Sequence, residues 1–381
     1  MTDHIVSRLR ALEVETPSWG YGDSGTRFAT FTQAGRPRTV FERIDDAAEV
    51  HRLTGTAPAV ALHFPWDAVD DLSALRAHAQ GLGLRIGAVN PNLFQDPDYK
   101  LGSITNPDVR IRDKAVAHLL ECVGIARELG SSAQSLWFAD GTSYAGQDDL
   151  RGRRARMLDC LARVYEALPA EQELLLEYKP YEPAFYATDL ADWGSALLVC
   201  QRLGERAKVL VDLGHHLPGA NVEQIVAILA QEGRLGGFHF NNRRYGDDDL
   251  IVGSTNPWEL FSIFVELGDH LPRLTIDQAH NVERKVEAMV LSVANLQEAY
   301  AKALLVDREA LANAQAAGDV LGGHELMLDA FRADVRPLCA SARAALGAAE
   351  DPVSAFRSGD WQERATAQRG DDVAVAGGWG R

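Results

Sequence analysis

Four side chains that can bind a metal ion recur at regular intervals in the second half of the chain. They are Glu177, Asp212, His239 and Asp277, and neighbouring members are 27 to 38 residues apart. Each lies at or near the end of a short apolar run of the kind that forms a buried strand. A single glutamate or histidine at such a place is usually solvated or hydrogen-bonded. Four at successive strand ends instead predict one site, because the carboxyl ends of barrel strands meet on one face.

The composition of this set indicates which ion it would hold. Three carboxylates and one imidazole are mainly oxygen donors. Such donors suit Mn²⁺, Mg²⁺ or Co²⁺ better than they suit a closed structural zinc site. The carboxylates would repel one another if no cation neutralised them. The sequence therefore predicts a divalent cation at this position.

A second cluster of possible ligands lies close to the first in the sequence. His215 follows Asp212 in the motif DLGHH, and the segment NNRRYGDDDL supplies Asp247, Asp248 and Asp249. In an extended loop, Asp247 and Asp249 would point the same way. A run of acidic residues is ordinarily a solvated loop, but beside a metal site it can hold a second cation. Paired metal ions polarise both oxygens of a hydroxy-carbonyl unit.

Short apolar runs alternate with longer segments of helical periodicity along most of the chain. The predicted strands are 57–64, 84–90, 132–138, 172–178, 207–212, 235–240 and 272–277. An eighth, near 14–20, is interrupted by Pro17. The clearest predicted helices are 109–129, 149–168, 222–232 and 281–304. Eight such units predict an α/β fold of the closed (β/α)₈, or TIM, barrel type. The alternative, an open doubly wound sheet, should carry a GxGxxG turn, and SWGYGDSG lacks one.

The last part of the chain shows a different pattern. The strand–helix alternation stops near residue 305, and the segment up to about residue 350 is helical without a strand. We predict a barrel domain over residues 1–305 and, over 306–381, a helical extension that contacts the barrel or another subunit. The segment from Arg369 is polar and rich in glycine and alanine, which is typical of a mobile tail.

The overall composition excludes several classes of partner. The formal net charge is −16 over 381 residues, and a strongly acidic protein repels nucleic acid and anionic membranes. The N-terminal residues are unlike a secretory signal, and no uninterrupted apolar stretch approaches 18 residues. The widely spaced cysteines, which form no CxxC pair, are typical of buried reduced thiols: Cys122, Cys160, Cys200 and Cys339. We expect a cytoplasmic protein whose partner is a small neutral molecule.

The motifs around the candidate ligands resemble those of the L-rhamnose isomerases, which are xylose-isomerase-like barrels. The resemblance covers roughly residues 10–305. It is carried by SWGYGDSGTRF (18–28), HFPWD (63–67), NPNLF (90–94), SLWFADG (135–141), LEYKPYEP (176–183), VLVDLGHHLPGANVEQIVAIL (209–229), GFHFNNRRYGDDDLIVGS (237–254) and IDQAHN (276–281). The GHHLPGANVEQIVA and NNRRYGDDDLIVGS blocks are the most specific. The segment after residue 305 matches only loosely.

The resemblance implies a role for each group of residues. The ligands of one metal ion would be Glu177, Asp212, His239 and Asp277, and those of a second His215, Asp247 and Asp249. Lys179 would contact the sugar near C1, and His63 would lie near its ring oxygen and C5. The aromatic pocket wall, which would also enclose a 6-deoxy methyl group, would be Trp19, Phe94 and Trp137, with Phe28 as a further candidate. The catalytic set would be Glu177, Lys179, His215 and Asp277.

These expectations describe a metal-dependent aldose–ketose isomerase that interconverts L-rhamnose and L-rhamnulose. D-Allose and L-mannose share the C2–C3 arrangement and are further candidate substrates. With metal ions at O1 and O2, hydrogen would move between C1 and C2, either as a hydride or as a proton through an enediol. The resemblance implies a homotetramer with two divalent ions per subunit, Mn²⁺ first and Co²⁺, Mg²⁺ or Zn²⁺ as alternatives.

Three other functions stay open on the sequence. A ketose 3-epimerase on the same fold needs two carboxylates on opposite faces of the sugar and one metal ion. Glu177 could be one of them, but Asp277 is short for the other, and the second cluster would have no purpose. A DNA repair endonuclease on a similar barrel would need more histidine ligands and a basic groove, which the net charge of −16 opposes. A non-catalytic sugar-binding barrel would not need the complete ligand set.

Overall fold

The computed structural model describes residues 2–26, 29–182, 186–279, 282–371 and 375–377. Parallel strands close into a barrel in the order β1-β12-β11-β10-β7-β6-β5-β4. They are β1 (Glu15–Pro17), β4 (Ala59–Phe64), β5 (Arg85–Pro91), β6 (Ala133–Trp137), β7 (Glu173–Glu177), β10 (Ala207–Asp212), β11 (Leu235–Phe240) and β12 (Arg273–Ile276). The predicted barrel is confirmed, and each predicted strand range coincides with one of these strands, although β5 extends one residue beyond its predicted range. Pro17 is tolerated because it ends the short strand β1.

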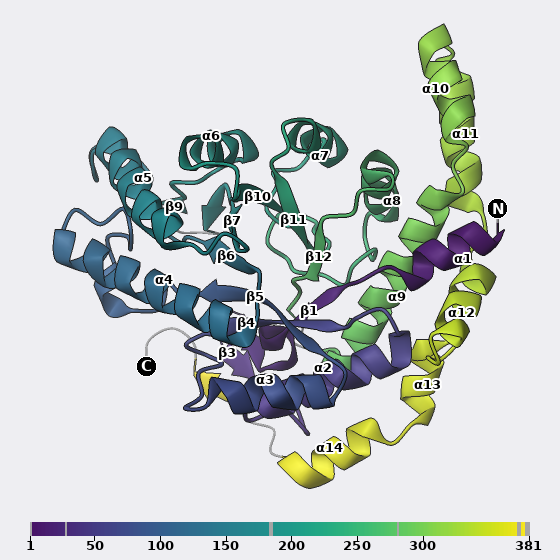
Figure 1. Ribbon diagram of the computed structural model, residues 1–381, viewed down its shortest axis with the longest axis horizontal. Helices are drawn as coiled ribbons and strands as arrows, with labels where there is room; N and C mark the ends of the chain where they lie inside the picture. Colours follow the sequence, from purple (N-terminus) through teal and green to yellow (C-terminus); the bar gives the residue numbers. More distant parts are fainter. Residues whose placement is uncertain (1, 27–28, 183–185, 280–281, 372–374, 378–381) are drawn as a thin grey trace.

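Helices surround this barrel on its outer face (Figure 1). They are α2 (Val40–Thr54), α3 (Leu72–Gly81), α4 (Val109–Leu129), α5 (Leu150–Ala167), α6 (Trp193–Leu203), α7 (Val222–Gln231), α8 (Pro257–Leu267) and α9 (Lys285–Leu304). Several begin at a residue whose side chain accepts a backbone N–H of the first turn, as Asp71 does before α3 and Asn221 before α7. Their apolar faces pack on the strands, so the core lies between the two layers.

Side chains inside the barrel form layers, because alternate residues of a strand point to the same face. One layer is apolar and mostly small: Ala61, Ala88, Ala133, Leu175 and Leu210. Two residues further along the same strands, the next layer is polar: His63, Asn90, Ser135, Glu177 and Asp212. The carboxyl end of the barrel is therefore a polar surface that rests on a packed apolar floor.

The helices after the barrel are α10 (Arg308–Ala317), α11 (Val320–Arg332), α12 (Arg336–Ala345), α13 (Pro352–Ser358) and α14 (Trp361–Arg369). The later ones pack on the barrel: α12 contacts α1 (Thr2–Arg10), and α13 contacts α9 and α2. Two arginines with buried side chains connect these helices to the helices of the barrel. Arg343 of α12 donates to Gln297 Oε1 at 2.6 Å, and Arg369 lies 2.9 Å from Asp46 Oδ1.

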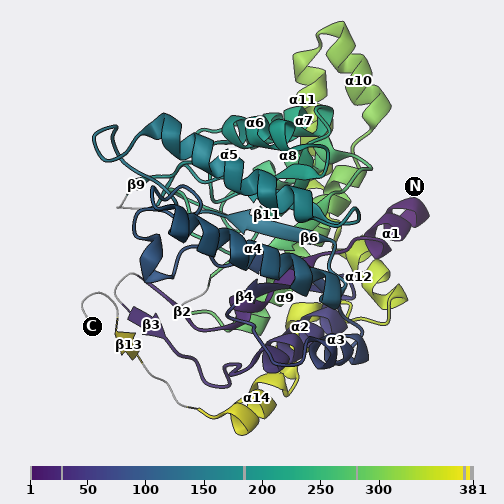
Figure 2. The same ribbon diagram turned by 60° about the vertical axis from the view of Figure 1, so that its left-hand side comes forward.

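Helices α10 and α11 are arranged differently from the later ones. They form a hairpin whose tip projects away from the barrel (Figures 1 and 2). At the start of α11, Val320 and Leu321 are 79% and 74% exposed. Near the C-terminus, Val375–Gly377 forms a short strand, β13, that pairs with β3 (Ala29–Phe31). No pattern in the sequence predicted that strand.

The cysteines and the helices agree with the expectations from composition. The four cysteines are all buried and none is in a disulfide, as predicted. None of the described helices combines the length and the apolar character that crossing a membrane requires.

Candidate active site

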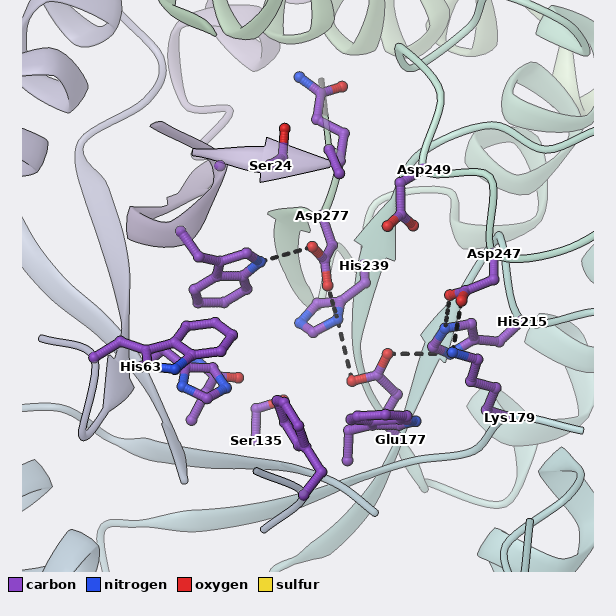
Figure 3. Close-up of a pocket in the computed structure, with 18 of the residues that line it drawn as sticks. Ser24, His63, Ser135, Glu177, Lys179, His215, His239, Asp247, Asp249 and Asp277 are labelled. Carbon is purple, nitrogen blue, oxygen red and sulfur yellow. Dashed lines mark hydrogen bonds and ion pairs between the residues drawn. The ribbon is translucent and has the colours of Figure 1, made fainter. Parts of the chain in front are cut away.

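The residues predicted to hold the first metal ion meet at the carboxyl end of the barrel. One ligand atom from each of Glu177, Asp212, His239 and Asp277 lies within 4.8 Å of all the others. They come from the neighbouring strands β7, β10, β11 and β12 or from the residue that follows the strand. Glu177, Asp212 and His239 are buried, and Asp277 is partly exposed. Figure 3 shows Glu177, His239 and Asp277 directed toward one another.

The ring of His239 provides a test of whether this set fits a cation. Its Nδ1 lies 3.2 Å from Glu177 Oε2, 3.3 Å from Asp277 Oδ2 and 3.8 Å from Asp212 Oδ2. This nitrogen is buried, but it forms no hydrogen bond with any described residue. Buried polar atoms are ordinarily paired. A ring nitrogen that faces three carboxylates without a hydrogen bond fits one ligand of a shared divalent cation.

The oxygens that face away from this common point are hydrogen-bonded. Asp212 Oδ1 accepts from the backbone N–H of Gly214 at 2.6 Å and from Asn241 Nδ2 at 2.9 Å. The indole N–H of Trp19 donates to Asp277 Oδ1 at 2.9 Å. Such outer contacts orient a ligand and are typical of metal sites. Trp19, predicted as pocket wall, therefore also positions Asp277.

His215, Asp247 and Lys179 form a connected group beside the first set (Figure 3). His215 Nδ1 lies 3.1 Å from the carbonyl oxygen of Tyr178, and its Nε2 lies 3.0 Å from Asp247 Oδ1. The carbonyl and the carboxylate can only accept, so both ring nitrogens carry a proton here, and Nε2 is the one that could bind a metal ion once its proton is lost. Lys179 Nζ donates to Asp247 Oδ2 at 2.6 Å. Only the first set, among the described residues, brings its ligand atoms within 4.8 Å of one another.

The acidic loop after β11 is not extended, so the condition under which Asp247 and Asp249 would point the same way is not met. Asp247 and Asp249 have φ angles of 60° and 47°, in the left-handed region. Aspartate and asparagine enter that region more readily than most residues. Asp248 lies between them in the sequence, and its carboxylate accepts backbone N–H groups of Arg244 and Tyr245, so it shapes the loop. Asp247 and Asp249 nonetheless line the pocket together.

Charges in the site are strongly coupled. Burial opposes ionisation of Glu177, but His239 and His215 hold its pKa well below the usual range. Burial likewise opposes the charge of His239, but Glu177 and Asp277 raise its pKa well above the ordinary value. Both interactions stabilise a proton where a cation would bind. A cation bound here would displace protons, so we expect its binding to weaken as the pH falls.

Two further groups that face the cavity have fixed charge states. Burial opposes the charge of Lys179, but Asp247 and Glu182 raise its pKa, so its side chain stays an ammonium. Burial lowers the pKa of His63 to about 3, assisted by the charges of His118 and Arg43, so this ring is neutral. Lys179 therefore acts as a donor, whereas His63 can donate from one ring nitrogen and accept at the other.

A cavity of about 290 Å³ opens beside the candidate ligands, and its opposite wall is aromatic. His63 stacks on Trp66 with ring centroids 3.8 Å apart, and Phe94 meets Trp137 edge-on at 5.0 Å. The predicted wall and contact residues all line this one cavity: Trp19, His63, Phe94, Trp137 and Lys179. Trp66 joins them, and Phe28 lies outside the described residues.

The chain can now be compared with known proteins. Residues 46–273 match the family described as xylose isomerase-like TIM barrel. The chain belongs to that family. A probable sugar isomerase of Rhizobium meliloti is 44% identical over an alignment 391 positions long, which covers 99% of this chain and 90% of the relative. A probable sugar isomerase of Mesorhizobium japonicum has the same identity and coverage. A solved L-ribulose 3-epimerase matches with a TM-score of 0.58 and 17% identity over 78% of this chain and 98% of its own, which shows a shared fold.

Several polar residues of this xylose isomerase-like barrel were not identified from the sequence. Asn241 donates to Asp212, and the only signal in the sequence is its position just after β11, two residues beyond His239. Asn90 and Ser135 line the cavity from β5 and β6. Lys285, at the start of α9, also lines it, and burial lowers the pKa of this lysine to about 8.

Proposed function

We propose that this protein is a divalent-metal-dependent aldose–ketose isomerase that interconverts L-rhamnose and L-rhamnulose. The observation that carries the proposal is one cavity with candidate metal ligands on one side and an aromatic wall on the other. The names of the Rhizobium meliloti and Mesorhizobium japonicum relatives, which are probable sugar isomerases, support activity on a sugar. The motifs shared with the L-rhamnose isomerases support the choice of sugar.

The residues around the cavity can divide the work of such a reaction. A bound divalent cation supplies a Lewis acid for the oxygens of a hydroxy-carbonyl unit. Lys179 remains protonated beside Asp247, so it can donate to an oxygen at the C1 end of an open-chain sugar. His63 is neutral and lies against Trp66, where it can bind an oxygen near C5. The indole rings exclude water from the sugar's C–H surface.

The first test is a panel of aldoses incubated with the metal-loaded protein, with ketose formation measured. An added or missing methyl group in an apolar pocket changes discrimination by roughly 10-fold or more. We expect kcat/KM for L-rhamnose to exceed that for L-mannose by about this factor, with D-allose also converted. Phe94→Ala should lower the ratio of kcat/KM for L-rhamnose to kcat/KM for L-mannose, because Phe94 forms part of the aromatic wall.

Two results would contradict this assignment. A preference for L-mannose over L-rhamnose would mean that the wall does not bind the C6 methyl group. Conversion of D-allulose into its C3 epimer, without any aldose, would favour the ketose 3-epimerase alternative on the same barrel.

We also propose a homotetramer in which the α10–α11 hairpin contacts another subunit. Val320 and Leu321 are highly exposed near the tip of that hairpin. Replacing both by serine should yield a smaller assembly in sedimentation, because the substitution removes apolar area from the contact. The exposed Leu198 of α6 provides a control, and Leu198→Ser should leave the mass unchanged. An unchanged mass for the hairpin variant would mean that its tip plays no part in assembly.

A further inference from the structure

The layer of side chains that carries the candidate metal ligands continues around the barrel with uncharged residues. Strands β4, β5 and β6 present His63, Asn90 and Ser135 at the level where β7 presents Glu177. His63 and Asn90 are register partners, and Ser135 lies on the strand next to β7. All three line the cavity, and Figure 3 shows Ser135 between His63 and Glu177. One half of the barrel mouth is thus charged and the other half is polar and neutral.

The hydroxyl group of Ser135 has no hydrogen-bond partner among the described residues. The residue is 2% exposed, and its Oγ makes no hydrogen bond to any described residue. Ala133 and Trp137 share its face of β6, and neither side chain offers an acceptor. Because buried hydroxyls are ordinarily hydrogen-bonded, the partner of Ser135 is expected to come from what the cavity holds.

Asn90 presents an acceptor whose position is fixed. Its Nδ2 donates to the carbonyl oxygen of Leu62 at 3.1 Å and to that of Ala88 at 3.4 Å. Carbonyl oxygens only accept, so these contacts decide which end of the amide is nitrogen. The remaining end, Oδ1, belongs to a residue that lines the cavity and is 7% exposed. It can accept a hydrogen bond from a hydroxyl group there.

We propose that Ser135 and Asn90 are specificity residues that bind the hydroxyl groups at C3 and C4 of the sugar. This inference rests on the proposed function, in which the C1 end of the sugar faces Glu177 and Lys179 and its C5 end faces His63. Around the barrel, Ser135 follows Glu177 and Asn90 follows Ser135. Ser135 therefore meets O3 and Asn90 meets O4. The pocket selects aldoses that have free hydroxyl groups at both carbons.

The experiment compares L-rhamnose with its 3-deoxy and 4-deoxy analogues. Ser135→Ala should lower kcat/KM for L-rhamnose by about 10-fold, because a hydroxyl of the bound sugar loses its partner. The same variant should leave the 3-deoxy analogue unchanged and still discriminate against the 4-deoxy analogue. Asn90→Ala should show the reverse pattern. The melting temperature of each variant reports whether it folds. If Asn90→Ala does not fold, the Ser135→Ala variant alone tests the proposal.

Ser131→Ala serves as a matched control. Ser131 is a buried serine that precedes β6, far from the cavity, and its Oγ donates to the carbonyl oxygen of Ala133 at 3.1 Å. Its substitution should leave all three rates unchanged. Equal losses on every sugar in the Ser135 variant would assign Ser135 a structural role and overturn the proposal. An active wild type with an unaffected Ser135 variant overturns it too, whereas a wild type inactive on L-rhamnose, L-mannose and D-allose overturns the proposed function itself.

Discussion

Removal of divalent cations with a chelator should abolish isomerase activity and lower the melting temperature, and Mn²⁺ or Co²⁺ should restore both. The reason is the convergence of Glu177, Asp212 and Asp277, whose charges oppose one another in a buried site. Burial raises the pKa of Asp212 to about 7 against the charge of His215, so the carboxylate form is disfavoured without a cation. Activity, calorimetry and metal content can be measured on the same sample.

A substitution pair makes this test specific to the site. Glu177→Gln should reduce bound metal, sugar binding and melting temperature together, because it removes a charged ligand and keeps the size of the side chain. Glu173→Gln is the matched control on the same strand. Glu173 lies at the other end of β7, and its Oε2 is 3.2 Å from Arg273 Nη2. Full turnover after exhaustive chelation, with no metal detected in the protein, would disprove metal dependence.

Replacing Asp247 and Asp249 together by asparagine should lower kcat for L-rhamnose by at least about 100-fold, since one electrostatic stabiliser is commonly worth that much. Asparagine tolerates the left-handed backbone at both positions, so the loop should keep its shape. We expect the variant to fold, to retain one tightly held metal ion and still to bind sugar. Metal counting after gel filtration, paired with turnover, checks all three expectations.

Asp248 provides the control for this double substitution. It carries the same charge in the same loop, but its carboxylate accepts backbone N–H groups, including that of Tyr245 at 3.0 Å. An asparagine there can still accept one such bond, so Asp248→Asn should lower kcat by a few-fold at most. Near-normal turnover of the Asp247/Asp249 variant would identify the acidic run as an ordinary solvated loop. The single-metal epimerase alternative would then gain support.

The sequence predicted the barrel and the first candidate ligand set well because both depend on simple regularities. Strands and helices differ in the period of their apolar residues, and each of the eight predicted strand ranges overlaps an observed strand. Parallel topology then places Glu177, Asp212, His239 and Asp277 at one end. No knowledge of side-chain conformation was needed for either step.

Other features depend on information that periodicity does not carry. The sequence left the conformation of the loop that carries Asp247 and Asp249 open, because the sign of φ depends on contacts of the folded loop, such as the hydrogen bonds to Asp248. Asn90 and Ser135 lie on strands whose two faces are both buried, so no alternation in hydrophobicity indicates which side chains point inward. Val375–Gly377 pairs with a strand more than 300 residues earlier, and no local pattern signals that partner.

The hydrogen bond between Trp19 and Asp277 crosses the place where the barrel closes. Glu15 of β1, the first strand, pairs there with Thr275 of β12, the last. During synthesis, a growing chain holds Trp19 early, but it gains the carboxylate that Trp19 orients only after some 250 further residues have been added. A ribosome-bound fragment that ends before Asp277 cannot form the complete ligand set, whatever the metal concentration around it. A metal ion held by all four of these residues would therefore bind only after nearly the entire barrel has been translated.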